Sequence, residues 1–165
     1  MHQHNYYSEL MGAIDNGNID EATTILENNP SILVGDETLI RYAASEDKVD
    51  IFALMLKYIS NLTDALLGEL LEEAALSEEG DKVVRHLLKM ASIKVSRQSA
   101  SIALISAVNV GNVDAVKSLC EIGNADPNFI CESGMNSLDY AIMFGFDEIE
   151  NVLRSVGGKE TNKQD

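Results

Sequence analysis

Apolar residues recur along the chain in short helical patterns that are separated by polar turns. Five alanines mark equivalent points in this pattern, at steps of 30, 31, 33 and 34 residues: Ala13, Ala43, Ala74, Ala107 and Ala141. Eight to ten residues after each alanine stands an apolar residue, followed three and four residues later by an apolar pair: Ile25-Leu26, Met55-Leu56, Leu87-Leu88, Leu119-Cys120 and Val152-Leu153. Offsets of three and four place side chains on one face of a helix. The pattern predicts an all-α solenoid of about five helix-turn-helix units.

Turn and capping residues divide each unit into two helices. In every unit but the third, the marker alanine is followed four residues later by a glycine, or by Asp47 in the second unit. Asn18 and Asn112 come next, where a side-chain oxygen caps the following helix. Glu21, three residues after Asn18, completes an approximate capping box.

The third unit follows the pattern least closely. Its first helix is predicted as one longish segment over 64–77, and Asp81 is expected to cap a helix over 82–90. The second helix of the second unit is expected over 49–60. We expect a single repeat domain over 1–156 and a polar, disordered tail over 157–165.

The net charge of −15 is concentrated in one half of the chain. Residues 1–80 carry 16 Asp/Glu and three Lys/Arg, whereas residues 81–165 carry 11 and nine. A negative field repels nucleic acid and anionic membranes and attracts a basic protein surface. The alternative is that the charge serves only to keep the protein soluble. We therefore expect a basic protein partner, no nucleic acid and no membrane.

Residues with catalytic or metal-binding chemistry are few. His2 and His4 stand near the amino terminus, where a histidine pair can hold copper or nickel, and His86 belongs to a helix with an apolar face. Cys120 occupies a core position of its unit, and Cys131 is expected to be exposed in a hairpin without a histidine nearby. Aromatic residues are 5% of the chain, which argues against a large cofactor pocket. We expect no catalytic residue, no metal site, no cofactor and no enzymatic activity.

The amino-terminal residues lack the basic start and apolar run of a leader peptide, and no segment is apolar enough to span a bilayer. Two cysteines do not make a disulfide framework. These features predict a cytoplasmic protein, with secretion into a host cell as the alternative.

The loop Gly123-Asn-Ala-Asp-Pro-Asn128, the helix start Leu138-Asp-Tyr-Ala141 and the segments 17–22 and 111–116 resemble the motifs of ankyrin repeats. The resemblance covers residues 8–156 and is strongest over 104–156. Asn136-Ser-Leu-Asp139 replaces the family's Thr-Pro-Leu-His, and Thr38 is the only threonine in place. A helical-pair repeat of about 34 residues also describes TPR-like arrays, but their Trp-Leu-Gly-Tyr pattern is missing here.

The resemblance implies that a protein partner is held on the concave side, by hairpin tips and by inner-helix positions two and three residues after each marker alanine. These positions are Asp15, Asn16, Ser45, Glu46, Asn109, Val110, Met143 and Phe144. Phe129 and Met135 in the last hairpin are expected to extend Met143 and Phe144 into an exposed apolar patch. That expectation assigns the core contacts of the last inner helix to Leu138, Ala141 and Ile142. Alternatively, Phe144 or Phe146 covers the core.

The leading hypothesis is a non-enzymatic protein-interaction module that binds a basic partner. Two roles fit it: a bacterial effector or adaptor, or an immunity-type inhibitor that covers a toxin's active site. The alternatives are a structural homo-oligomer and an enzyme with an unrecognised site. The sequence leaves the oligomeric state open.

Overall fold

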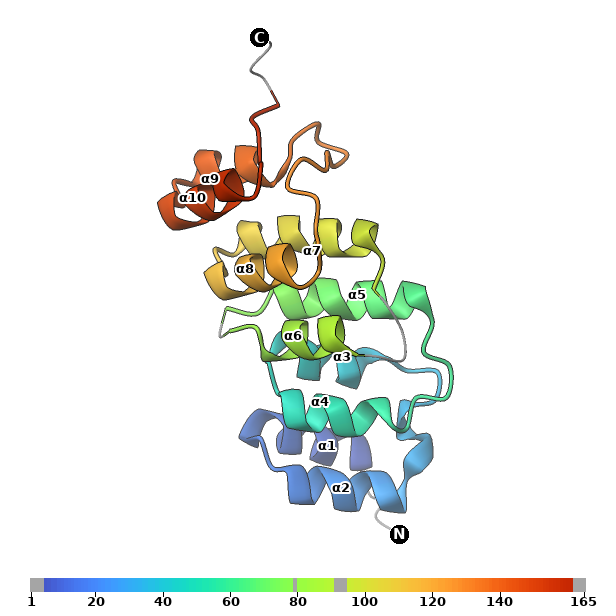
Figure 1. Ribbon diagram of the computed structural model, residues 1–165. Coiled ribbons are helices and arrows are strands. Elements are labelled where there is room, and N and C mark those ends of the chain that lie inside the picture. The colour runs from blue at the N-terminus through green and yellow to red at the C-terminus, as the bar shows by residue number, and fades with distance from the viewer. Residues whose placement is uncertain (1–4, 79, 91–94, 162–165) are drawn as a thin grey trace.

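The computed structural model describes residues 5–78, 80–90 and 95–161, and these form ten α-helices and one short 3-10 helix (Figure 1). His2 and His4 lie outside the described residues. The helices make five consecutive pairs: α1 (Tyr6–Asn16) with α2 (Ile19–Asn28), α3 (Thr38–Ser45) with α4 (Val49–Leu56), α5 (Asp64–Ala75) with α6 (Lys82–Lys89), α7 (Arg97–Asn109) with α8 (Val113–Glu121), and α9 (Ser137–Phe144) with α10 (Asp147–Ser155). The 3-10 helix η1 (Pro30–Leu33) follows α2.

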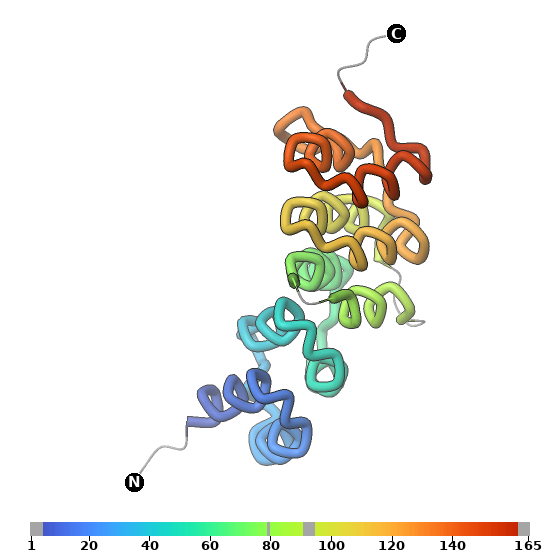
Figure 2. The backbone as a smooth tube through the Cα atoms, turned by 90° about the vertical axis from the view of Figure 1, so that its left-hand side faces the viewer, coloured from blue at the N-terminus to red at the C-terminus, as the bar shows by residue number. Residues whose placement is uncertain are grey.

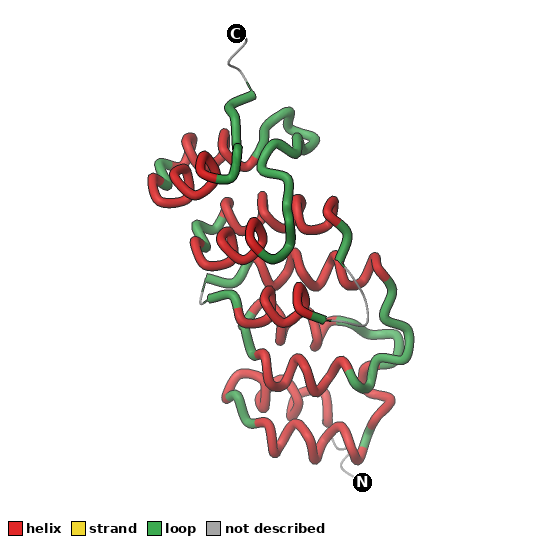
Figure 3. Tube along the Cα trace, viewed as in Figure 1, coloured by secondary structure: helices red, strands yellow, loops and turns green. Residues whose placement is uncertain are grey.

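The pairs stack in chain order from the amino-terminal end to the carboxy-terminal end (Figure 2). The first helices α1, α3, α5, α7 and α9 pack on one another in one layer, and the second helices pack on one another in a second layer. Loops connect the helices throughout the described part of the chain, which contains no strand (Figure 3). The predicted helix-turn-helix solenoid of five units is confirmed.

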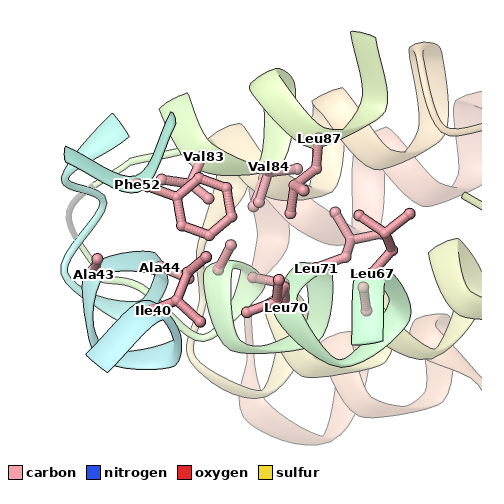
Figure 4. Close-up of a cluster of buried hydrophobic side chains, with 14 of the residues drawn as sticks. Ile40, Ala43, Ala44, Phe52, Leu67, Leu70, Leu71, Val83, Val84 and Leu87 are labelled. Carbon is pink, nitrogen blue, oxygen red and sulfur yellow. The ribbon is translucent and has the colours of Figure 1, made fainter. Parts of the chain in front are cut away.

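The marker alanines sit where the helices approach most closely. All five are at most 1% exposed. Larger side chains from both layers fill the space around them, as in the centre of the stack, where Phe52, Val84 and Leu87 face Ile40 and Leu70 (Figure 4). Small residues at the contacts and large ones between them give the close packing that a single core requires.

One turn geometry recurs in four of the five pairs. The carbonyl of the marker alanine accepts the N–H of the residue five positions later, at 2.9 to 3.0 Å. The residue before that donor has a positive φ in each case, and it is Gly17, Asp47, Gly111 or Gly145. Asp47 adopts this left-handed conformation at φ 51°, which aspartate tolerates better than most residues. The substitution of glycine by aspartate in the second unit therefore keeps the turn.

The third pair departs from this turn, and three helices of the second and third pairs end earlier than expected. Helix α5 ends at Ala75 instead of residue 77, α4 ends at Leu56 instead of residue 60, and α6 ends at Lys89 instead of residue 90. The side chain of Asp81 makes no capping bond to α6; it accepts hydrogen bonds from Arg85 and Ser118 instead. Asp81 thus stands at the N-cap position as predicted, but its side chain does not cap the helix.

Two asparagine caps are confirmed, and one of them also joins two units. The Oδ1 of Asn18 accepts the N–H of Glu21 at 3.2 Å, and the Oδ1 of Asn112 accepts the N–H of Ala115 at 2.9 Å. The side-chain amide of Asn112 also donates to the carbonyls of Ser77 and Gly80, at 2.5 and 2.8 Å. It thereby ties the turn of the fourth unit to the longer turn of the third.

The structure differs from a disordered tail over the first residues after the repeats. The N–H of Lys159 donates to Oδ1 of Asn128 and the N–H and hydroxyl of Thr161 donate to Asp139. The amide of Asn136 donates to the carbonyl of Lys159 at 2.7 Å. Residues 157–161 thus lie against the last unit, and residues 162–165 lie outside the described part.

Candidate protein-binding surface

Each first helix has one side with a stripe of residues that are mostly exposed or half-buried, although Ile105 and Ser106 on α7 are buried. The stripe occupies the positions five, two and one before the marker alanine and two after it, a spacing that keeps side chains on one helical face. We call this surface the inner-helix face. It comprises Ser8, Met11, Gly12 and Asp15 on α1; Thr38, Arg41, Tyr42 and Ser45 on α3; Glu69, Glu72, Glu73 and Leu76 on α5; Ile102, Ile105, Ser106 and Asn109 on α7; and Tyr140, Met143 and the next residue, Phe144, on α9.

Contacts between neighbouring first helices join the stripes of α1, α3, α5 and α7. The hydroxyl of Tyr42 on α3 donates to Oδ1 of Asp15 on α1 at 2.5 Å. The guanidinium of Arg41 on α3 pairs with Glu69 on α5. Farther along, the hydroxyl of Ser106 on α7 donates to Oε1 of Glu72 on α5 at 3.2 Å.

The Asp15 contact also changes the chemistry of its partner. The hydrogen bond to this carboxylate, together with burial and the negative charge, raises the pKa of Tyr42 to about 12. Tyr42 therefore stays a neutral hydrogen-bond donor at physiological pH.

The middle of the inner-helix face is acidic. Helix α5 carries four acidic residues, three of them on this face, and no basic residue. Arg41 is the single cation among the residues that define the face, and Glu69 and Glu37 already neutralise it. Carboxylates that outnumber cations in this way produce a negative local potential.

The carboxy-terminal end of the face is apolar. Met143 is 57% exposed and Phe144 is 44% exposed. The ring of Tyr140 stacks on Phe144 with 6.0 Å between ring centroids, and its hydroxyl lies 2.9 Å from the hydroxyl of Ser133 in the hairpin. Large apolar side chains in a supported, exposed position are typical of interaction surfaces.

The sequence left open whether Phe144 or Phe146 covers the core. The two phenylalanines, at the end of α9 and just before α10, differ in this respect. Phe146 is half-buried against the core, and its ring lies where a Cβ on Gly111 would come within 3.2 Å. Phe144 remains exposed. Ile142 is 40% exposed, so its assignment to the core is wrong, whereas Leu138 and Ala141, the other two residues assigned to the core, are buried.

The other sequence-predicted residues lie on or beside the inner-helix face. Asp15, Asn16 and Asn109 are exposed, whereas Ser45, Glu46, Val110, Phe129 and Met135 are partly exposed. Ser45 and Glu46 line a hollow of about 320 Å³ together with Leu76, Ser77 and Glu78. The hairpin that carries Phe129 and Met135 is closed by the N–H of Cys131, which donates to the carbonyl of Met135 at 3.0 Å.

The amino-terminal half of each stripe was not predicted, and Arg41 and Tyr42 were not among the expected binding residues. The acidic run that contains Glu69, Glu72 and Glu73 has two interpretations from the sequence, a solvated face or a docking surface for Lys/Arg. All five residues stand three, four or seven residues before the positions two after the marker alanines, so helical spacing places them on this face.

The two thiols have different surroundings. Burial and Glu121 raise the pKa of Cys120 to about 11. A hydrogen bond from Ser133 lowers the pKa of Cys131, which is half-buried instead of exposed as expected. Within the described residues, no group of three or more His, Cys, Asp and Glu side chains has a metal-binding arrangement. None of the helices in the described part combines the length and apolar character needed to cross a membrane.

The comparisons with known proteins agree with this architecture. A family model for three copies of the ankyrin repeat matches residues 71–165, which is more than half of the chain. A search of curated proteins finds no match. The chain belongs to the ankyrin-repeat family, whose repeats are general protein–protein interaction modules.

Proposed function

We propose that this protein is a non-enzymatic binding module that holds a basic protein partner on its inner-helix face. The observation that carries the proposal is the composition of that face, which has three carboxylates of α5 at its centre and Met143 and Phe144 at one end. Acidic groups steer a basic partner toward the face. Apolar side chains that become buried in the complex slow its dissociation. The same negative potential disfavours nucleic acid and anionic membranes as partners.

Two biological roles fit such a module. One is a bacterial effector or adaptor that acts on a host protein. The other is an immunity-type inhibitor that covers the active site of a toxin. In both roles the partner binds to the same face. The two free cysteines support a location in a reducing, cytoplasmic compartment.

The experiment is a capture of partners from the source cell and from cells that surround it. The bait is the wild-type chain and a variant with Glu69, Glu72 and Glu73 changed to glutamine. The matched control changes Glu27, Asp114 and Glu121, which are exposed on second helices, to their amides and alters net charge equally. Wild type and control retain the partner, and the α5 variant loses it.

Added salt provides the second arm of this experiment. Electrostatic steering predicts that the association rate falls steeply as salt rises, while dissociation changes little. Equal binding by both triple variants, or an association rate that ignores salt, would discard the acidic face as the docking site.

A further inference from the structure

Helix α6 is chemically the opposite of the helix that it packs against. It carries Lys82, Arg85 and Lys89 within eight residues and no acidic residue, in a chain with 12 Lys/Arg and 27 Asp/Glu. Its pair partner α5 carries four acidic residues and no basic one. The third unit therefore presents an acidic surface in the first-helix layer and a basic one in the second-helix layer.

A shallow, mostly apolar groove of about 390 Å³ lies beside these cations. Its lining consists of Val49, Lys82, Arg85, His86, Lys89 and Met90. Val49 comes from the preceding pair, and Met90 directly follows α6. His86 packs edge-on against the buried ring of Phe52, with 6.3 Å between ring centroids, so its imidazole is a fixed wall of the groove.

The two lysines at this groove have weak ion pairs, or none, with the described carboxylates of the protein. Lys82 is 68% exposed, and its one ion pair is a long contact of 3.7 Å to Asp47. Arg85 pairs with Asp81 at 2.6 Å. No described carboxylate forms an ion pair with Lys89, which is exposed. Residues 82, 85 and 89 share one helical side, so the two exposed lysines stand at either end of one positively charged edge.

We infer that this groove binds an acidic segment of a protein partner, with an apolar side chain on Val49 and Met90 and carboxylates facing Lys82 and Lys89. Charge complementarity selects the acidic segment, because opposite charges across an interface favour one partner and repel others. The apolar lining selects a peptide over a nucleic acid strand, which offers its phosphates but no aliphatic side chain.

This surface is separate from the inner-helix face, because it lies in the layer of second helices. One molecule can therefore hold a basic partner on the first layer and an acidic segment on the second. The third unit, which resembles the repeat motifs least, is the point at which the two surfaces lie back to back.

A binding titration with designed probes tests the inference on the full-length chain. The probe is a fluorescently labelled peptide in which glutamates flank leucines, followed by fluorescence anisotropy at low salt. Control probes replace the leucines with serine, replace the glutamates with lysine, or substitute a labelled single-stranded oligonucleotide. We expect the Glu/Leu peptide to bind most tightly and the three control probes to bind weakly or not at all.

Charge reversal at the groove supplies the decisive variant. K82E/K89E is expected to weaken the Glu/Leu peptide by about tenfold or more, since like charges then face each other. K57E/K159E has the same net charge and exposed lysines away from the lining, and it should stay within about twofold of wild type. Met90→Ser should weaken the Glu/Leu peptide as well. Thermal unfolding checks that all variants fold. If K82E/K89E does not fold, Lys89→Gln replaces it.

Three results would overturn the inference. The first is no binding of the Glu/Leu peptide to the wild-type chain. The second is an equal loss in the two double variants, which would reduce the effect to net charge. The third is equal or tighter binding of the Glu/Ser peptide or of the oligonucleotide, which would show an ionic surface without a peptide-binding groove.

Discussion

The carboxylate of Asp47, in the turn of the second helix pair, accepts the backbone N–H of Val83 in the third pair at 2.8 Å. These residues are 36 positions apart. Asp47 therefore supplies from another unit the cap that Asp81 does not provide for α6. The side chain is 3% exposed, and the backbone of Asp47 holds the left-handed conformation that glycine adopts in three other units. One aspartate thus shapes one turn and caps the next unit's helix.

Substitutions of Asp47 should separate these two roles. Asp47→Gly keeps the turn and removes the cap, so we expect a loss of about 1–2 kcal/mol in the free energy of unfolding. Asp47→Ala removes the cap and forces alanine into the left-handed region, which adds about 1 kcal/mol more. Asp47→Asn retains an acceptor and tolerates this backbone, and should lose least. Urea denaturation measures all three, and equal stability of the glycine variant and wild type would refute the cap.

Asn112 and Asn18 provide a matched pair, because each follows its marker alanine by five residues and caps a second helix. Only Asn112 also donates to the carbonyls of Ser77 and Gly80 in the neighbouring unit. Asn18→Ala should therefore cost about 1 kcal/mol. Asn112→Ala should cost about 2–4 kcal/mol, since a buried carbonyl and a half-buried one lose this donor. Chemical denaturation of both variants checks the difference, and equal costs would show that the bonds between units contribute nothing.

Phe144 and Phe146 should respond oppositely to substitution. Phe144→Ser removes an exposed ring, so we expect less than about 1 kcal/mol of lost stability together with weaker partner binding. Phe146→Ser removes a ring packed against Gly111 and the core, and should cost about 2 kcal/mol or more. Thermal unfolding measures the stabilities, and binding to the captured partner measures the interaction. A large loss of stability in the Phe144 variant would assign that ring to the core.

Asp139 should make the stability of the last unit depend on pH. Burial alone would raise the pKa of this carboxyl, but hydrogen bonds from Asn136 and Thr161 outweigh burial and lower it. A lowered pKa means that the charged form stabilises the fold above the ordinary value of 3.8, and that this contribution is lost as pH falls further.

Asp139→Asn is the comparison for this effect. The stability advantage of wild type over Asp139→Asn should be constant from about pH 7 to about pH 5 and shrink below about pH 4. Denaturation series across this range measure it, with amide exchange at Thr161 as a local readout of the docked segment. An advantage that stays unchanged in acid would show that the carboxylate is not ionised preferentially in the folded state.

The repeat pattern was predictable because a solenoid repeats its contacts. Each marker alanine has the same neighbours in its own unit, so period and spacing alone locate the buried positions. The family model matches from residue 71 onward, which is within α5 of the third unit. The first two units are placed by the same alanine spacing and by the stacked helices.

What the sequence could not reveal are the contacts that join units through side chains. Nothing near Asp47 in the sequence indicates that its carboxylate reaches Val83, and Asp81 stands in the position that local capping rules prefer. The Asp139 contacts of Thr161 likewise join residues 22 positions apart, so composition alone made residues 157–161 resemble a disordered tail. Capping rules consider only residues that are near in sequence, whereas in the folded stack the hydrogen-bond partners come from neighbouring units.

The inner-helix face was predictable only in part for a related reason. Met143 and Phe144 are conspicuous because they are large and apolar in a short helix with few other core demands. From the sequence, Glu69, Glu72 and Glu73 could form either a solvated face or a docking surface for Lys/Arg, and the contacts of Arg41 and Ser106 place them on the same surface as the neighbouring helices. The sequence places these charges on a helix, but only the neighbouring helices show which surface of the protein they belong to.

Hydroxyl-radical footprinting of the complex with the captured partner tests the central claim most directly. The reaction labels exposed side chains, and the chain carries reactive probes on both layers: Met143, Phe144 and Tyr42 on the inner-helix face and Met90 in the groove beside α6. We expect a basic partner to protect Met143, Phe144 and Tyr42 and to leave Met90 unchanged. Protection of Met90 with no change at Met143 and Phe144 would contradict it.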